Sequence, residues 1–298
     1  YNIGYGDEVI TTPYTFFGTI GAIITAGAKP IFVDIKDDYN IDESLIEKSI
    51  TKKTKAILPV HWSGRPCDLD VLLKISKKYK IPIIQDSCHA IMSKFKNKSL
   101  VEFGASCYSM HPLKNLNVWG DGGIIVTDNK VLADNLKLIR NHGLINRDTC
   151  VEFSYNSRLD TIQAVVAKHL IENRLDQITK SRINNAFMYD SLLREIPFLK
   201  IPKRIGGNKE VFHLYTFQAK ERNRLADFLK SNGVDAKIHY PIPMHMQPAA
   251  RKYNYSEGDY PIAEKLCKTT ISLPVHEFIT EKEIYYVSDL IKKFYKQI

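Results

Sequence analysis

Short apolar runs alternate with amphipathic stretches over residues 8–127. The runs are β-rich and lack polar alternation, which is typical of strands buried on both faces of a parallel sheet. Between them, Asp42–Ile50 and Asp68–Tyr79 have helical periodicity and begin with good N-cap residues. The predicted strands are Val9–Thr11, Pro30–Ile35, Ala56–Val60, Ile81–Asp86, Ser106–Met110 and Gly123–Thr127. The pattern predicts an α/β fold with a mainly parallel sheet flanked by helices.

Helical periodicity continues beyond the last predicted strand. Residues 130–140 are predicted to form one helix with an apolar face, and a longer helical pattern, Leu159–Leu193, is interrupted near Asp176. A helix of this length is expected to link two parts of the chain.

The chain changes character after Pro197. Loops rich in proline and glycine separate short strands from two helical patterns, Arg224–Asn232 and Thr280–Tyr295. We therefore expect a large domain over residues 1–180 and a smaller C-terminal α+β domain over residues 181–298, hinged on the long helix. A length of 298 residues suits this division.

The net charge of +9, from 42 basic and 33 acidic residues, raises the question of nucleic-acid binding. The basic residues are scattered pairs such as Lys52-Lys53 and Lys77-Lys78, as on solvated helix faces. Neither a DNA-reading module nor a clustered basic stripe is present in the sequence, so a nucleic-acid partner is not expected. A positive field would suit phosphorylated or carboxylate ligands instead.

The cysteines and the apolar segments indicate a cytoplasmic protein that does not span a membrane. Five cysteines form no CxxC pair and no even framework, and they read as reduced thiols, with no metal site expected. No apolar run approaches the roughly 20 residues of a membrane span. The chain opens on Tyr1 directly before a strand-like segment. We therefore expect further residues upstream.

A lysine and an aspartate follow neighbouring predicted strands. Asp86 ends one strand, and Lys114 lies in the long connection Ser109–Gly123 that follows the next; ligands gather at such strand ends in α/β sheets. Taken singly, Lys114 reads as a surface lysine and Asp86 as the N-cap of a following helix. Taken together, they resemble the pair that pyridoxal phosphate needs: a lysine to hold it as a Schiff base and an acid to keep its ring nitrogen protonated.

A series of short landmarks runs nearly from end to end of the chain. They are Gly6–Ile10, Thr15-Phe16, Ala26–Pro30, Val33-Asp34, Lys55–His61, Gly64, Asp68, Gln85–Ala90, Lys114-Asn115, Gly120–Gly123, Arg140–Gly143, Tyr155–Leu159, Gln163-Ala164, His239–Pro241, His245 and Ser272–Pro274. In order and spacing the series resembles the DegT-type nucleotide-sugar aminotransferases, pyridoxal-phosphate enzymes of the aspartate aminotransferase fold. No single landmark is specific, but the order and spacing together are.

The resemblance implies cofactor-binding roles for several residues. Lys114 would hold the cofactor covalently and move the proton between cofactor and substrate carbons, and Asp86 would pair with the pyridine nitrogen. Phe16 would stack on the ring face, with a core aromatic as the alternative. His89 would lie near the phenolic oxygen, with a histidine at a helix start as the alternative. Ser109 would bind the phosphate through its hydroxyl.

The resemblance also implies a homodimer with shared active sites. Asn156 would reach the cofactor phosphate of the neighbouring subunit, and Arg158 would contact a carboxylate or a phosphate. His245 lies in the family's substrate region. His111 replaces an aromatic residue that often precedes Pro-x-Lys in the family, and Ser157 stands where many relatives carry an aromatic. Both departures concern the sugar site and leave the cofactor chemistry untouched.

The implied activity is transfer of an amino group from glutamate to a nucleotide-linked keto sugar, in surface-polysaccharide or amino-sugar biosynthesis, by a ping-pong route. Two alternatives stay open. In sugar dehydratases of the same fold the lysine is replaced, commonly by histidine, so Lys114 favours transamination. A non-catalytic regulatory or binding relative would keep the fold alone, and the intact Lys114 and Asp86 count against it. The family's Ser-Gly-Thr phosphate loop lies upstream of the first landmark, outside this chain.

Overall fold

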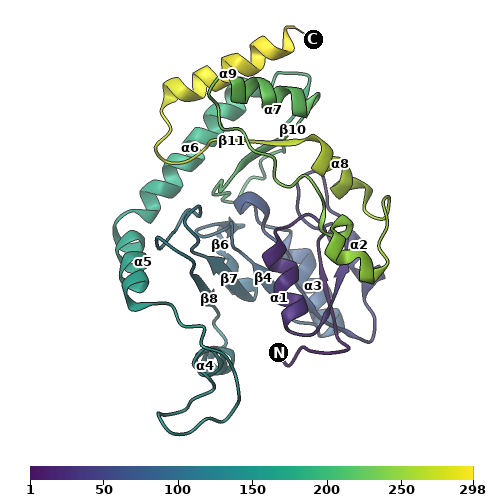
Figure 1. Cartoon of the computed structure of the whole chain (residues 1–298), viewed down its shortest axis with the longest axis vertical. Helices are drawn as coiled ribbons and strands as arrows, with labels where there is room; N and C mark the ends of the chain where they lie inside the picture. Colours follow the sequence, from purple (N-terminus) through teal and green to yellow (C-terminus); the bar gives the residue numbers. More distant parts are fainter. Residues whose placement is uncertain (298) are drawn as a thin grey trace.

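The computed structural model describes residues 1–297 and places the strands of the first half in one sheet (Figure 1). These strands are β1 (Glu8–Thr11), β2 (Lys29–Phe32), β3 (Thr54–Ile57), β4 (Ile84–Asp86), β7 (Ala105–Ser109) and β8 (Gly123–Val126). β1 pairs in parallel with β2 and β3, β4 pairs in parallel with β7, and β8 runs antiparallel to β7. Parallel bridges Ile57–Ile83 and Val60–Asp86 join β3 to β4. The order is therefore β2-β1-β3-β4-β7-β8, and the predicted α/β fold is confirmed.

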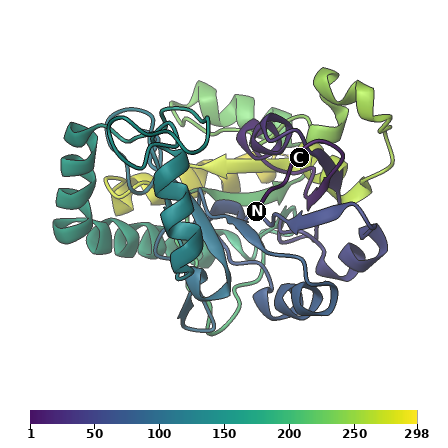
Figure 2. The same cartoon turned by 90° about the horizontal axis from the view of Figure 1, so that it is seen from below.

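Helices cover both faces of this sheet (Figures 1 and 2). They include α1 (Phe17–Thr25), α2 (Glu43–Ser49) and α3 (Leu69–Tyr79). Val9 of β1 packs in the same cluster as Ile23 of α1. Its neighbour Ile10 packs with Leu72 of α3, because successive side chains of a strand point to opposite faces. Burial on both faces explains why the strands lack polar alternation.

The helix starts follow the N-cap signals where these exist. The Asp42 carboxylate accepts from the Ser44 N–H at 3.0 Å, and the Asp68 carboxylate accepts from the Val71 N–H at 3.3 Å. Helix α1 was not predicted, because its sequence is almost wholly apolar and shows no polar face to mark a helical period.

The long helical pattern forms two helices rather than one. α5 (Thr161–Asn173) and α6 (Leu175–Leu193) meet at Arg174, two residues before the predicted interruption. α4 (Lys130–Ile139) forms as predicted, but none of its residues is buried. Figure 1 shows α4 and the loop after it projecting from the body of the chain. Within residues 1–297, the apolar face of α4 is therefore only partly covered.

The C-terminal part is a small antiparallel sheet packed on helices. Its strand order is β11-β10-β9. Ala186 and Tyr189 of α6 share one core with Phe217 of the central strand and Ile291 of the last helix. Of the three C-terminal helices, α8 was not predicted, because its short helical pattern begins at Pro261 in a region rich in turn residues. The elements are β9 (Leu199–Lys200), β10 (Tyr215–Ala219), α7 (Arg222–Ser231), α8 (Pro261–Thr269), β11 (Thr270–Leu273) and α9 (Glu281–Tyr295).

Short elements complete the fold. A hairpin of β5 (Lys94–Phe95) and β6 (Lys98–Ser99) follows β4. Short 3-10 helices are η1 (Trp62–Gly64), η2 (Leu100–Phe103), η3 (Met244–Met246) and η4 (Pro248–Tyr253). The five cysteines are free thiols. Within residues 1–297, no helix combines the length and the hydropathy needed to cross a bilayer.

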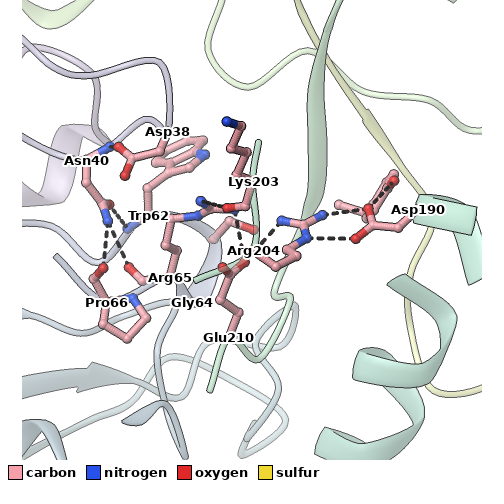
Figure 3. A network of polar contacts seen from close by, with 12 residues as sticks. Asp38, Asn40, Trp62, Gly64, Arg65, Pro66, Asp190, Lys203, Arg204 and Glu210 are labelled. Carbon is pink, nitrogen blue, oxygen red and sulfur yellow. Dashed lines mark hydrogen bonds and ion pairs between the residues drawn. The ribbon is translucent and has the colours of Figure 1, made fainter. Parts of the chain in front are cut away.

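A buried ion network ties the two parts together (Figure 3). Arg204 contacts Asp190 of α6 at 2.8 Å and Glu210 at 3.1 Å. Arg65, which follows η1 in the N-terminal part, contacts the same Glu210 oxygen at 3.1 Å. Both side chains of the Arg65–Glu210 pair are more than 90% buried. Removing Glu210 would leave the buried charge of Arg65 without its ion-pair partner, at a typical cost of about 3–5 kcal/mol.

Candidate active site

Asp86 lies at the carboxyl end of β4 with both carboxylate oxygens engaged. Thr19 of α1 donates its hydroxyl to Oδ2 at 2.7 Å, and the Cys88 N–H donates to Oδ1 at 3.1 Å. The carboxylate is therefore held in one orientation at the edge where parallel strands end. Residues 87–93 form turns. The alternative that Asp86 caps a following helix is wrong, and the same turns exclude the helix-start alternative for His89.

Lys114 lies in the loop between β7 and β8, on the same edge of the sheet. Its N–H donates to the His111 carbonyl at 2.8 Å, and its neighbour Asn115 donates through its side chain to the Val211 carbonyl at 3.1 Å. These two hydrogen bonds fix the position of the loop between β7 and β8. Burial lowers the pKa of the Lys114 amine, and the nearby Cys88 and Asp86 oppose that shift only in part. A lowered pKa favours the neutral amine, the form that attacks a carbonyl carbon.

The charge of Lys114 acts on three histidines, His89, His213 and His239. Burial lowers the pKa of His89 and of His213 well below the usual range, and the positive charge of Lys114 contributes to both shifts. Burial, with Lys114 next, lowers the pKa of His239 to about 4. His239 Nδ1 lies 3.0 Å from the hydroxyl of buried Ser272. At neutral pH all three rings are uncharged and can exchange hydrogen bonds with a ligand.

Aromatic rings border the site. Phe16 precedes α1, is 55% exposed, and lies 6.1 Å from the ring of Tyr240. The alternative that Phe16 is a core aromatic is therefore wrong. Burial, with the charge of Asp86 next, raises the pKa of Tyr240, which places its hydroxyl in the neighbourhood of that carboxylate. An exposed ring close to a fixed carboxylate suits a flat heteroaromatic ligand.

Three other predicted residues, Ser109, His111 and His245, form hydrogen bonds with their own neighbours. Ser109 ends β7, and its hydroxyl oxygen accepts from the His111 N–H at 3.2 Å. The His111 side chain is exposed and accepts from the Leu113 N–H at 3.2 Å. His245 is buried and pairs with Glu264 at 3.0 Å. Among residues 1–297, none of the side-chain hydrogen bonds of His111 or His245 leads to Asp86 or Lys114.

Asn156 and Arg158 lie in the exposed turn before α5. The Asn156 side chain accepts from the Arg158 N–H at 3.1 Å, and the Arg158 guanidinium donates to the Asn141 side chain. Asn141 and Asn156 also form an antiparallel bridge. The turn is thus well ordered, but within the described residues it makes no hydrogen bond to the Asp86–Lys114 centre.

Thr19, Cys88, His213, His239 and Tyr240 belong to the centre but were not assigned from the sequence. His239 and Tyr240 stand in a landmark, His239–Pro241, which marked the segment without giving it a role. Thr19 and His213 carry no local signal, because only the fold brings α1 and the segment before β10 to this strand edge.

The side chains fit pyridoxal phosphate. The cofactor requires a lysine amine to hold it, an oriented carboxylate for its ring nitrogen and an apolar face for its ring. Lys114, Asp86 and Phe16 supply these three groups from one edge of the structure.

Comparisons with known proteins find relatives over nearly the whole chain. The sequence profile of the DegT/DnrJ/EryC1/StrS aminotransferase family matches residues 1–292. The chain is 41% identical to the pleiotropic regulatory protein of Geobacillus stearothermophilus, over 99% of this chain and 80% of that protein. It is 34% identical to the UDP-2-acetamido-2-deoxy-3-oxo-D-glucuronate aminotransferase of Pseudomonas aeruginosa, over 95% of this chain and 78% of that enzyme. The structure of DesV from S. venezuelae, in complex with a ketimine intermediate, matches with a TM-score of 0.95 at 32% identity, over 98% of this chain and 79% of DesV.

Proposed function

Because the chain belongs to the DegT/DnrJ/EryC1/StrS aminotransferase family, we propose that it transfers the amino group of glutamate to the keto carbon of a nucleotide-linked sugar. It is an aminotransferase that depends on pyridoxal phosphate. One observation carries the proposal: a lysine whose pKa is lowered by burial lies at the same strand edge as a carboxylate held by two donors. The retained Lys114 also favours transamination over the dehydratase alternative.

Different residues of this chain would bind different parts of the cofactor. Asp86 would bind the ring nitrogen, Phe16 would cover one face of the ring, and Ser109 would bind the phosphate. The bound cofactor supplies an electron sink for the substrate carbon. Lys114 would hold the cofactor covalently, and its Nζ would then carry the proton that is moved during amino transfer. A neutral amine can take up that proton, which is why the lowered pKa of Lys114 matters.

Close to Lys114, the groups that would contact the sugar are uncharged. Ser272 engages Nδ1 of His239 and leaves Nε2 of that ring free of hydrogen bonds among the described residues. Neutral imidazole and phenol groups suit the hydroxyl groups of a sugar better than a second charge would. His111, His245 and Arg158 stay predicted substrate contacts. We place the reaction in the cytoplasm, in surface-polysaccharide or amino-sugar biosynthesis.

The substrate class can be tested in the reverse direction. Cofactor-loaded natural protein is mixed with a UDP-linked or dTDP-linked amino sugar, or with the same amino sugar lacking the nucleotide. We expect one of the nucleotide-linked sugars to convert the cofactor to its aminated form, seen as loss of visible absorbance, at least 100-fold faster than the free sugar. Equal rates with and without the nucleotide would contradict the proposed substrate class.

We also propose a homodimer whose active sites are shared. The turn that carries Asn156 and Arg158 lies among exposed apolar side chains, with Phe153 99% and Tyr155 83% exposed. The neighbouring helix α4 buries none of its residues within this chain. Exposed apolar surface of this extent is typical of a protein interface. In a two-fold dimer the turn of one subunit would reach the cofactor phosphate of the other.

Subunit exchange tests the shared site. Lys114→Ala and Asn156→Ala/Arg158→Ala homodimers of the natural protein are each expected to be nearly inactive. After mixing and exchange, one site in each heterodimer carries neither lesion. Half of the dimers are then heterodimers with one intact site of two, so activity should recover to about a quarter of wild type, from symmetry alone. Verified heterodimers without recovery would show that Asn156 and Lys114 serve one site from one chain.

A further inference from the structure

A backbone clamp joins the loop after β3 to the segment before β10. The His213 N–H donates to the Ser63 carbonyl at 2.9 Å, and the Ser63 hydroxyl donates to the Leu214 carbonyl. Arg65, two residues after Ser63, pairs with Glu210 at 3.1 Å (Figure 3). Hydrogen bonds and a buried ion pair therefore fix the two segments against each other.

The clamp is tight at Gly64. This residue has a φ of +93°, and a Cβ there would lie 2.6 Å from a methyl carbon of Val211 and 2.8 Å from the His89 carbonyl oxygen. Only glycine combines this backbone conformation with so close an approach. The loop after β3 is thus wedged between the segment before β10 and the turn that carries His89.

Ser63 of this loop fixes the ring of His89. The Ser63 N–H donates to His89 Nδ1 at 3.2 Å. A backbone N–H can only donate, so Nδ1 must present its lone pair, and the proton of the neutral ring lies on Nε2. Burial, with Lys114 and His239 contributing, holds the pKa of His89 well below its usual range, so the ring stays neutral. His89 therefore offers its ligand one donor, Nε2–H.

His213 packs against this ring from the C-terminal part. The two imidazole centroids are 4.3 Å apart with an interplanar angle of 40°. Arg182 of α6 donates to the carbonyl oxygens of Phe212 and His213 at 3.4 Å each, and its guanidinium pairs with Glu277 at 3.2 Å. His213 is thus held in place by α6 and cannot easily withdraw from His89.

We propose that His213 is a positioning residue for His89: its ring blocks rotation of the His89 imidazole, and its main chain holds Ser63 where Ser63 orients Nδ1. The inference rests on the proposed function and on the role that the family resemblance implies for His89, near the phenolic oxygen of the cofactor. A fixed N–H donor stabilises the anionic form of that oxygen. His213 acts through His89 and needs no contact with cofactor or substrate.

Two variants of His213 distinguish the effect of a flat ring against His89 from the effect of filling the space beside it. His213→Phe keeps a flat ring, whereas His213→Leu fills the space without one; His276→Leu, at an exposed histidine, is the control. The first readout is the set of ring ¹⁵N shifts of cofactor-free protein, with His89→Gln identifying the His89 signal. We expect the Nε2–H tautomer in wild type, His213→Phe and the control, and averaged tautomers in His213→Leu. A fixed Nε2–H tautomer in His213→Leu, or an Nδ1–H tautomer in wild type, would overturn the proposal.

The second readout is the pH at which the visible absorption of cofactor-loaded protein changes. Loss of a fixed donor destabilises the anionic oxygen. The midpoint pH of the absorption change should therefore rise by on the order of one pH unit in His213→Leu, and it should stay near the wild-type value in His213→Phe. Equal midpoints in all variants, or equal rises in both His213 variants, would reject positioning by the stacked ring. Absence of a visible band in loaded wild type would instead count against the proposed function, and the tautomer measurement would still decide the role of His213.

Discussion

Replacing Lys114 by alanine should abolish turnover, with a loss on the order of 10³-fold or more, because one amine both tethers the cofactor and moves the proton. No other lysine is linked to the Asp86–Lys114 centre by a hydrogen bond or ion pair among residues 1–297. The measurement is the rate at which glutamate converts the cofactor to its aminated form in a single half-reaction.

The matched control for this variant is Lys48→Ala, at an exposed lysine of α2 on another face of the sheet. It should react at the wild-type rate. A Lys114→Ala protein that aminates its cofactor within about tenfold of the control rate would remove Lys114 from the chemistry, since general acid–base catalysis alone contributes at least about 100-fold.

The second large effect is expected for Asp86→Asn, with a loss of turnover on the order of 100-fold. Asparagine keeps the shape: its Oδ1 can still accept from the Cys88 N–H, while its Nδ2 would donate to the Thr19 hydroxyl. It cannot hold the ring nitrogen protonated, because a neutral amide lacks the negative charge that favours the proton. Cofactor affinity should fall by less, within about tenfold, since one hydrogen bond to the ring can survive.

Equilibrium binding of the cofactor and steady-state turnover, measured on the same Asp86→Asn protein, separate these two effects. Asp42→Asn is the control, because Asp42 caps α2 and asparagine caps nearly as well. If turnover and affinity fell together and equally, Asp86 would only help to retain the cofactor. Unchanged turnover would reject its pairing with the ring nitrogen.

The sheet was predictable from the sequence because its strands form continuous apolar runs, most of them buried in the sheet, although β8 at the edge is mostly exposed. The pairing of Asp86 with Lys114 followed from the same reasoning, since β4 and β7 are parallel and their carboxyl ends meet at one edge. Helix α1 was not predicted because an apolar helix has no polar face to mark its period. Helix α8 was not predicted because it begins at a proline, as the surrounding turns do.

The rest of the centre could not be predicted from local patterns. His213 reaches His89 only because Arg182, Ser63 and the Arg65–Glu210 pair bring the C-terminal part against the loop after β3. His245 shows the converse case: a landmark position whose side chain is satisfied by Glu264 away from Lys114. Side-chain contacts across the chain decide such roles, and periodicity carries no information about them.

The central claim is that Lys114 and Asp86 form a pyridoxal-phosphate site that accepts the amino group of glutamate. It is tested most directly by the visible absorption spectrum of the natural protein loaded with pyridoxal phosphate, before and after glutamate is added. We expect a visible band that disappears with glutamate and returns with 2-oxoglutarate, and that is missing in Lys114→Ala. A wild-type protein without such a band, or with a band that glutamate leaves unchanged, would contradict the claim.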